Sequence, residues 1–371
     1  MNTVSTPTER AWLRLALADG IGPVVAGRLI DRLGGVLQVA EASLPALRAA
    51  AGPVRARALH AALRASRPET VLRRAGELGQ HVLTPVSAGW PARRFAPLHD
   101  PPLVLFLRGH LSPAEPPAVA IVGTREAGHP GLSFARGLAG SLARGGHWIV
   151  SGLALGVDGA AHGGALAAGR AGTVAVLGCG VDVPYPEEHL DLKEQIVDRG
   201  GGLLSEHPPG TPAQPGHFPR RNRLVAALAA AVVVVEAPAR SGALITARLA
   251  LDMGREVLAA PGPAGRAAWR GSHRLLKSGE AALCDGPRDV LAALGCDGAP
   301  PGEAAIGDDR PPPAAGAPLA VWGVIDETEA VGVDEICRRT GLLASDVATA
   351  LARLELDGRV VRVPGVGFRR L

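Results

Sequence analysis

The sequence lacks the features that mark several common classes of protein. Its four cysteines include no Cys-x-x-Cys pair, which argues against a zinc ribbon or a redox motif. Its first residues lack the apolar core of a signal peptide, and no run of about 18 apolar residues follows. We therefore predict a protein of the reducing cytoplasm that does not enter a membrane and holds no metal ion.

The motifs of nucleotide-dependent enzymes are missing as well. No Walker A sequence occurs, and the first predicted strand-to-helix turn lacks G-x-G-x-x-G. Ser241-Gly242 precedes a predicted helix, but the Gly-x-Ser-x-Gly elbow of hydrolases is absent, so a contact with phosphate or a helix cap is the better interpretation. We predict that the protein is not an enzyme and needs no cofactor.

Positive charge is unevenly distributed along the 371 residues. Only two of the 39 basic residues are lysines, and the formal net charge is +4. Residues 1–117 carry 14 basic and 8 acidic groups, a net charge of +6, whereas residues 318–371 carry 7 and 8, a net charge of −1. A polyanionic partner would therefore meet local arginine clusters, not a uniformly positive surface.

Residues 1–110 are predicted to form an N-terminal helical domain. Its clearest feature is a Gly-Ile-Gly-Pro turn at 20–23, in which Pro23 is well placed as the first residue of a helix. This element resembles a helix-hairpin-helix, whose turn amides face a DNA phosphate. An ordinary turn between two helices fits the same pattern.

Residues 111–294 alternate between short apolar strands and helices. Strands are predicted at 118–123, 147–151, 173–177, 202–205, 232–236 and 256–260. Helices are predicted between them at about 158–168, 187–199, 219–230 and 242–254, with another after the first strand. This alternation predicts an α/β fold with a Rossmann-like, doubly wound, mainly parallel sheet.

The remaining sequence forms a linker and a small domain. Residues 295–317 are rich in Pro, Gly and Ala and lack periodicity, as is typical of a linker. In residues 318–371, two predicted helices and a terminal hairpin indicate a winged helix. Because this domain is slightly acidic, we expect protein contact or auxiliary DNA contact there.

The carboxyl ends of the predicted strands carry the candidate binding residues, because ligands of open parallel sheets bind at that edge. Glycines let anionic oxygens approach backbone amides, and arginines bind phosphates in bidentate fashion. The expected ligand is therefore a row of phosphates. The candidates are Gly123, Thr124, Arg125, Ser151, Gly152, Gly156, Phe218, Arg220, Arg221, Asn222, Arg223, Ser241 and Gly242, with Lys277 extending the basic surface.

Several of these positions have a second interpretation. Arg125 binds a phosphate or pairs with a neighbouring carboxylate, and the arginines at 220–223 bind phosphate or form a solvated turn. Phe218 stacks on a base or packs against its own helix. Asp158 and His162, four residues apart, are an acid–base pair or, more simply, a cap and a local hydrogen bond.

The same segments resemble one known family. The sequences are GTR at 123–125, SGLALGVD at 151–158, TVAVLGCG at 173–180, FPRRNR at 218–223, SGALITA at 241–247 and REVLAAPG at 255–262. Together they resemble the DNA-processing protein A (DprA) family, with departures at Pro130 and at Gly271-Ser272-His273. The resemblance implies single-stranded DNA binding, a homodimer, and loading of the recombinase RecA onto DNA during natural transformation.

Two other functions remain open from the sequence. One is a nucleotide-binding or nucleotide-hydrolysing Rossmann-like enzyme, although EAPARSGALITA at 236–247 lacks the helix glutamate of such enzymes. The other is a transcription factor that acts through its winged helix.

Overall fold

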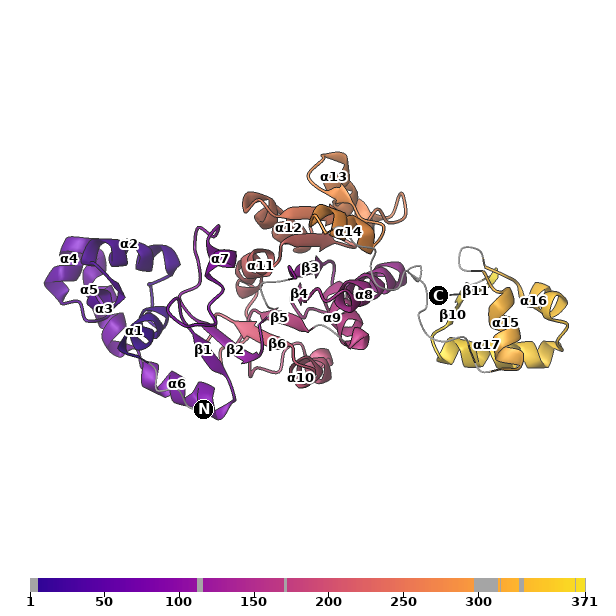
Figure 1. Ribbon diagram of the computed structural model, residues 1–371, viewed down its shortest axis with the longest axis horizontal. Helices are drawn as coiled ribbons and strands as arrows, with labels where there is room; N and C mark the ends of the chain where they lie inside the picture. The colour runs from indigo at the N-terminus through magenta and orange to yellow at the C-terminus, as the bar shows by residue number, and fades with distance from the viewer. Residues whose placement is uncertain are drawn as a thin grey trace. The chain divides into compact units, whose positions relative to one another are not determined.

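The computed structural model describes residues 6–111, 116–169, 172–296, 313, 315–326, 330–363 and 365–370. The chain divides into two compact units, Met1–Glu303 and Ala304–Leu371, and each is described by itself (Figure 1). Most of the predicted linker lies outside the described residues. Within the described ranges, no helix combines the length and the apolar character that crossing a membrane requires.

The first unit is built on a nine-stranded sheet with the order β1-β2-β6-β5-β4-β3-β7-β8-β9. All neighbours from β6 to β9 pair in parallel, whereas β1 and β2 are antiparallel to their neighbours. The strands are β1 (His81–Leu83), β2 (Leu105–Gly109), β3 (Val119–Val122), β4 (Ile149–Ser151), β5 (Thr173–Leu177), β6 (Gly202–Ser205), β7 (Ala231–Val234), β8 (Glu256–Ala259) and β9 (Ala282–Leu283). The predicted α/β fold with a mainly parallel sheet is confirmed.

Helices cover both faces of this sheet, which explains why its central strands are apolar on both sides. In β3, Ala120 and Val122 belong to the core that contains α11 and α12, whereas Val119 and Ile121 belong to the core of α8 and α9. The helices are α7 (Ala92–Phe95), α8 (His129–Arg144), α9 (Val157–Ala168), α10 (Leu190–Asp198), α11 (His217–Leu228), α12 (Ala243–Asp252), α13 (Arg270–Lys277) and α14 (Pro287–Ala293), with 3₁₀ turns at Glu187–His189 and Ala267–Trp269.

Six further helices precede the sheet in sequence. They are α1 (Pro7–Ala16), α2 (Pro23–Leu33), α3 (Val36–Ala40), α4 (Leu44–Ala51), α5 (Pro53–Ala65) and α6 (Pro68–Glu77). As predicted, α2 begins at Pro23, directly after the Gly-Ile-Gly turn. The expectation of a purely helical segment before residue 110 missed β1 and β2, which continue the sheet beyond β6.

The second unit is the winged helix that the sequence predicted. It contains α15 (Ala317–Val324), α16 (Val333–Thr340), α17 (Ala344–Leu356) and a hairpin of β10 (Val360–Val363) with β11 (Gly367–Arg370). Val321, Ile336 and Leu351 lie in its core, and Phe368 pairs with Val331 across an isolated bridge. Helix α15 was not among the predicted elements.

Candidate nucleic-acid interface

The candidate site lies where the sheet reverses its strand order. From β3 the chain builds β4, β5 and β6 on one side and then β7, β8 and β9 on the other. Such a reversal opens a crevice outside the carboxyl ends of the two central strands. Here the segments after β3 and β7 line a cleft of about 700 Å³. A smaller cavity of about 320 Å³ adjoins it and shares Arg125, Tyr185, Phe218 and Arg221 with it.

The cleft contains nine of the fourteen candidates from the sequence. They are Gly123, Thr124, Arg125, Gly152, Phe218, Arg221, Asn222, Ser241 and Gly242. Arg125 follows β3, Ser241 follows β7 and Asn222 lies in α11, so the fold brings distant parts of the sequence to one surface. Arg240 and Tyr185 also line the cleft, although the sequence analysis did not select them.

Arg125 is an exposed cationic residue of the cleft, and its guanidinium lies over an aromatic ring. Its guanidinium carbon lies 5.1 Å from the centre of the Phe218 ring, a cation–π contact. In the described part of the chain, no ion pair joins Arg125 to Glu126 or Asp158. The guanidinium donors therefore remain open to an anionic ligand in the cleft.

The Phe218 ring packs against both an aromatic and a cationic side chain. Its ring centre lies 5.4 Å from that of Tyr185 at an interplanar angle of 40°, and Arg125 covers its ring as well. A Cβ atom at Gly178 would lie 3.0 Å from the Phe218 ring, so that glycine makes room for the ring. Phe218 is thus packed in place and still lines the cleft, and a base would have to displace Arg125 or Tyr185 to stack on it.

Arg221 is buried, unlike the exposed phosphate ligand that the sequence suggested. It is 6% exposed, and its Nη1 donates to the carbonyl of Gly152 at 2.6 Å and to that of Val176. Burial raises the pKa of the nearby Asp158 carboxyl, and the charge of Arg221 opposes that rise. Arg221 therefore anchors α11 to the ends of β4 and β5 and forms part of the cleft wall.

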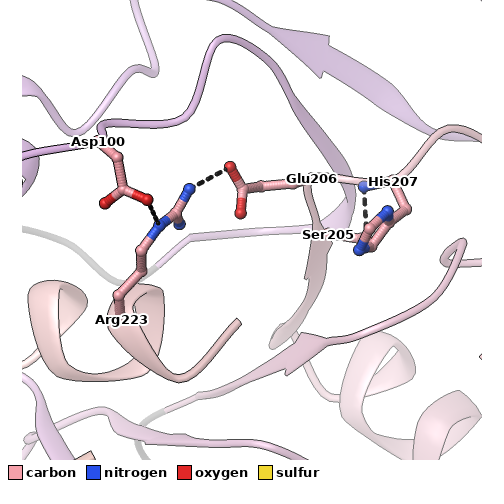
Figure 2. A network of polar contacts seen from close by, with 5 residues as sticks. All are labelled: Asp100, Ser205, Glu206, His207 and Arg223. Atoms are coloured by element: carbon pink, nitrogen blue, oxygen red, sulfur yellow. Dashed lines mark hydrogen bonds and ion pairs between the residues drawn. The ribbon is translucent and has the colours of Figure 1, made fainter. Parts of the chain in front are cut away.

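Five candidates lie outside the cleft. Arg223 is 5% exposed and is held between Asp100 and Glu206, as Figure 2 shows. The Ser151 hydroxyl donates to the carbonyl of Ile121 inside the sheet. The other three, Gly156, Arg220 and Lys277, are not among the cleft residues.

The glycines near the cleft make room for neighbouring protein atoms, whereas the sequence had suggested that they make room for a phosphate. A Cβ at Gly123 would lie 2.4 Å from Val157, and one at Gly152 would lie 2.4 Å from the Arg221 guanidinium. Gly156 has φ +78°, and a Cβ there would lie 2.3 Å from the Thr124 carbonyl oxygen. These glycines allow close approach of the protein's own parts, so they position the cleft walls.

Glu236 occupies the helix N-terminus at which many Rossmann-like proteins bind a nucleotide phosphate. Its Oε2 accepts a hydrogen bond from the Gly128 amide at 3.0 Å, at the start of α8. A Cβ at Gly131 would lie 2.2 Å from the same oxygen, so Gly131 leaves room for the carboxylate. A carboxyl group of the protein thus occupies the place where a pyrophosphate would bind, which disfavours the nucleotide-enzyme interpretation.

Asp158 and His162 have separate partners and form no acid–base pair. Asp158 accepts a hydrogen bond from the Gly152 amide at 3.0 Å. The Thr173 hydroxyl donates to the Ile149 carbonyl, so it accepts from His162 Nδ1 at 2.7 Å, which fixes the neutral tautomer of the imidazole. His162 Nε2 is buried and has no hydrogen-bond partner within the described residues.

This environment predicts a loss of stability in mild acid. Burial lowers the pKa of His162 from 6.5 to about 3. Because the unfolded chain binds this proton more readily than the folded chain, the free energy of unfolding is highest above pH 6.5 and falls as pH drops toward 3. Between pH 7.5 and 5.0 we expect His162 to account for a loss of about 2 kcal/mol, and His162→Gln to flatten the dependence by that amount. Urea unfolding followed by circular dichroism at both pH values measures it, and equal pH dependence in both proteins would contradict the prediction.

Comparisons with known proteins agree with this architecture. Residues 81–295 match the family model of the DNA recombination-mediator protein A, and residues 308–366 match that of the DprA winged helix domain. The chain is 38% identical to protein Smf of Escherichia coli, over 80% of this chain and 79% of that one. It is 39% identical to a putative DNA processing protein DprA of Mycobacterium tuberculosis, over 78% and 76% of the two chains.

Solved structures extend the likeness to three dimensions. The DprA structure from Streptococcus pneumoniae superposes with a TM-score of 0.67 at 31% identity, covering 78% of this chain and 98% of that one. The Helicobacter pylori protein, solved in a study of its single-stranded DNA binding mode, gives a TM-score of 0.50 at 30% identity and covers 59% and 96%. Because the family models match both the α/β sheet region and the winged helix, the chain belongs to the DprA family of DNA-processing proteins.

Proposed function

We propose that this protein binds single-stranded DNA in the cleft beside β3 and β7. The observation that carries the proposal is the convergence of Arg125, Asn222 and Ser241 on one surface, joined there by Arg240. Arg125 and Arg240 are exposed and supply charge, whereas Asn222 and Ser241 supply polar groups that suit phosphate oxygens. The H. pylori relative, solved in a study of its single-stranded DNA binding mode, supports the same choice of ligand.

The size and openness of the cleft favour a strand over a mononucleotide. The cleft and its side cavity together extend from the end of β5 to the start of α12, across the width of four neighbouring strands. Phosphate contacts of this kind carry little sequence information, so we expect weak sequence preference and strong salt dependence.

Fluorescence anisotropy tests this proposal directly. A labelled single-stranded oligonucleotide should bind more tightly than the matching duplex, and unlabelled mononucleotides should fail to displace it. Raising the salt from 50 to 200 mM should weaken binding steeply, since each phosphate contact releases counterions. Equal affinity for duplex DNA, or displacement by mononucleotides at comparable concentration, would contradict the proposal.

We further propose that the protein loads RecA onto this DNA in natural transformation and acts as a cytoplasmic homodimer. Its membership of a family of recombination mediators supports the first part. The four free cysteines, among which no disulfide forms, fit a reducing compartment. RecA ATPase activity on DNA already coated with single-strand binding protein should start sooner when this protein is added. Light scattering of the full chain should give twice the mass of 37.8 kDa.

A further inference from the structure

Arg223 lies outside the cleft, and two carboxylates hold its side chain. Arg223 Nε donates to Asp100 Oδ2 at 3.0 Å, and its Nη2 donates to Glu206 Oε1 at 2.7 Å. Figure 2 shows the guanidinium between the two acids, which come from separate segments. Asp100 precedes β2, and Glu206 follows β6 directly. We call Asp100, Arg223 and Glu206 the acid–arginine clamp.

Helical geometry explains why Arg223 leaves the cleft while its neighbours line it. Besides Pro219 in its first turn, α11 lines the cleft with Phe218, Arg221, Asn222 and Val225, which occupy the i, i+3, i+4 and i+7 positions of one helical face. Arg223 lies about 100° around the axis from Asn222. Its anchor therefore acts on a different side of α11 from the cleft and fixes the rotation of the helix.

Two other contacts hold α11 against the same surroundings. The imidazoles of His207 and His217 stack with ring centres 4.1 Å apart, so the residue after Glu206 contacts the first residue of α11. Near the other end of the helix, Arg255 Nη2 donates to the carbonyls of Arg94 and Ala227, each at 3.2 Å. The segment around residues 94–100 thus lies along α11 and is tied to it at two points.

We propose that Arg223 is a positioning residue for the DNA-binding cleft and does not bind DNA itself. The clamp sets the rotation of α11, and this rotation aims Phe218 and Asn222 into the cleft. The clamp also transmits the position of the segment before β2 to the binding surface. This inference rests on the proposed function, because it concerns the same cleft.

Whether binding of single-stranded DNA weakens or strengthens when Asp100 or Glu206 is neutralised distinguishes a positioning role of Arg223 from direct DNA contact. If Arg223 bound phosphate, removing its acidic partners would free the guanidinium and strengthen binding of single-stranded DNA. If Arg223 positions α11, the same substitutions weaken binding although they remove negative charge. For Asp100→Asn and Glu206→Gln we expect a loss of affinity of roughly 10-fold, the lower end of the range for residues that orient metal ligands.

Matched variants control for charge and for ion-pair loss. Glu126 lines the cleft, so Glu126→Gln removes a negative charge there and should strengthen binding slightly. Asp252 pairs with Arg248 on the exposed side of α12 at 3.3 Å, outside the cleft, so Asp252→Asn should leave the affinity unchanged. Circular dichroism melting of each variant verifies that the full chain is folded.

The salt dependence of binding shows whether a variant loses affinity by losing a phosphate contact or by another cause. Arg125→Gln should lower the slope of log K against log salt by about 0.7, because one phosphate contact is lost. The two clamp variants should keep the wild-type slope while the affinity falls. Unchanged or stronger binding by folded Asp100→Asn and Glu206→Gln would overturn the positioning role. Failure of the wild-type chain to bind single-stranded DNA would instead overturn the proposed function.

Discussion

Arg125→Glu should lower the affinity for a single-stranded oligonucleotide by about 100-fold at 0.1 M salt, the largest effect expected from one substitution in the cleft. Arg125 is exposed, no ion pair of its guanidinium is found within the described chain, and the guanidinium lies over the face of Phe218. A carboxylate at this position removes one phosphate contact and repels the phosphates that remain. Anisotropy titration of the full-length variant measures the effect.

A charge reversal elsewhere on the same unit provides the control. Arg73 lies on α6, outside the cleft, and its side chain is 74% exposed beside Glu77. Arg73→Glu changes the net charge as Arg125→Glu does, so it reports the general electrostatic effect on a polyanion. A loss of affinity as large for Arg73→Glu as for Arg125→Glu would show that the cleft is not the binding surface.

Arg221→Met should destabilise the first unit by about 3–5 kcal/mol. The substitution keeps an apolar side chain of similar length but removes the hydrogen bonds to the Gly152 and Val176 carbonyls. It also leaves the buried Asp158 carboxylate without the positive charge that now faces it. Removing a buried cation is costly because the polar groups that it satisfied stay buried without it. Urea denaturation followed by circular dichroism measures the loss.

The neighbouring arginine gives a matched comparison. Arg220 is exposed, and Arg220→Met should change the free energy of unfolding by no more than about 0.5 kcal/mol. Equal stability of the two variants would contradict the anchoring role of Arg221. The pair also shows why a DNA-binding assay of Arg221 variants needs a stability measurement beside it.

The alternation of strands and helices was predictable because it depends on local periodicity and on turn residues. All six strands predicted between 118 and 260 are present, with ends displaced by up to two residues. The strand β2 was missed because it pairs with β6, about 100 residues later in the sequence, and β1 joins the sheet only through β2. A three-residue strand such as His81–Leu83 has too little alternation to stand out.

The surface on which the candidate residues meet could be predicted, but the role of each residue could not. Strand ends of a parallel sheet converge at one edge whatever the side chains are, so Arg125 and Ser241 were expected at one edge, and both line the cleft. The buried Arg221 donates to two backbone carbonyls and the buried Arg223 to Asp100 and Glu206, and only the tertiary fold brings these partners within reach. The helical periodicity of residues 218–225 could have predicted this difference, because it places Arg223 on another side of the helix from Phe218, Arg221 and Asn222.

The pairing of β2 with β6 has a consequence for synthesis of the chain. Phe106 pairs with Ser205, so 99 further residues must leave the ribosome before β2 obtains this neighbour. At about 5–20 residues per second that interval lasts roughly 5–20 s. During it, the apolar Leu105–Leu107 edge is available to other nascent chains, and slower elongation prolongs its exposure. The yield of folded protein should therefore rise with faster elongation or with a chaperone that shields this segment.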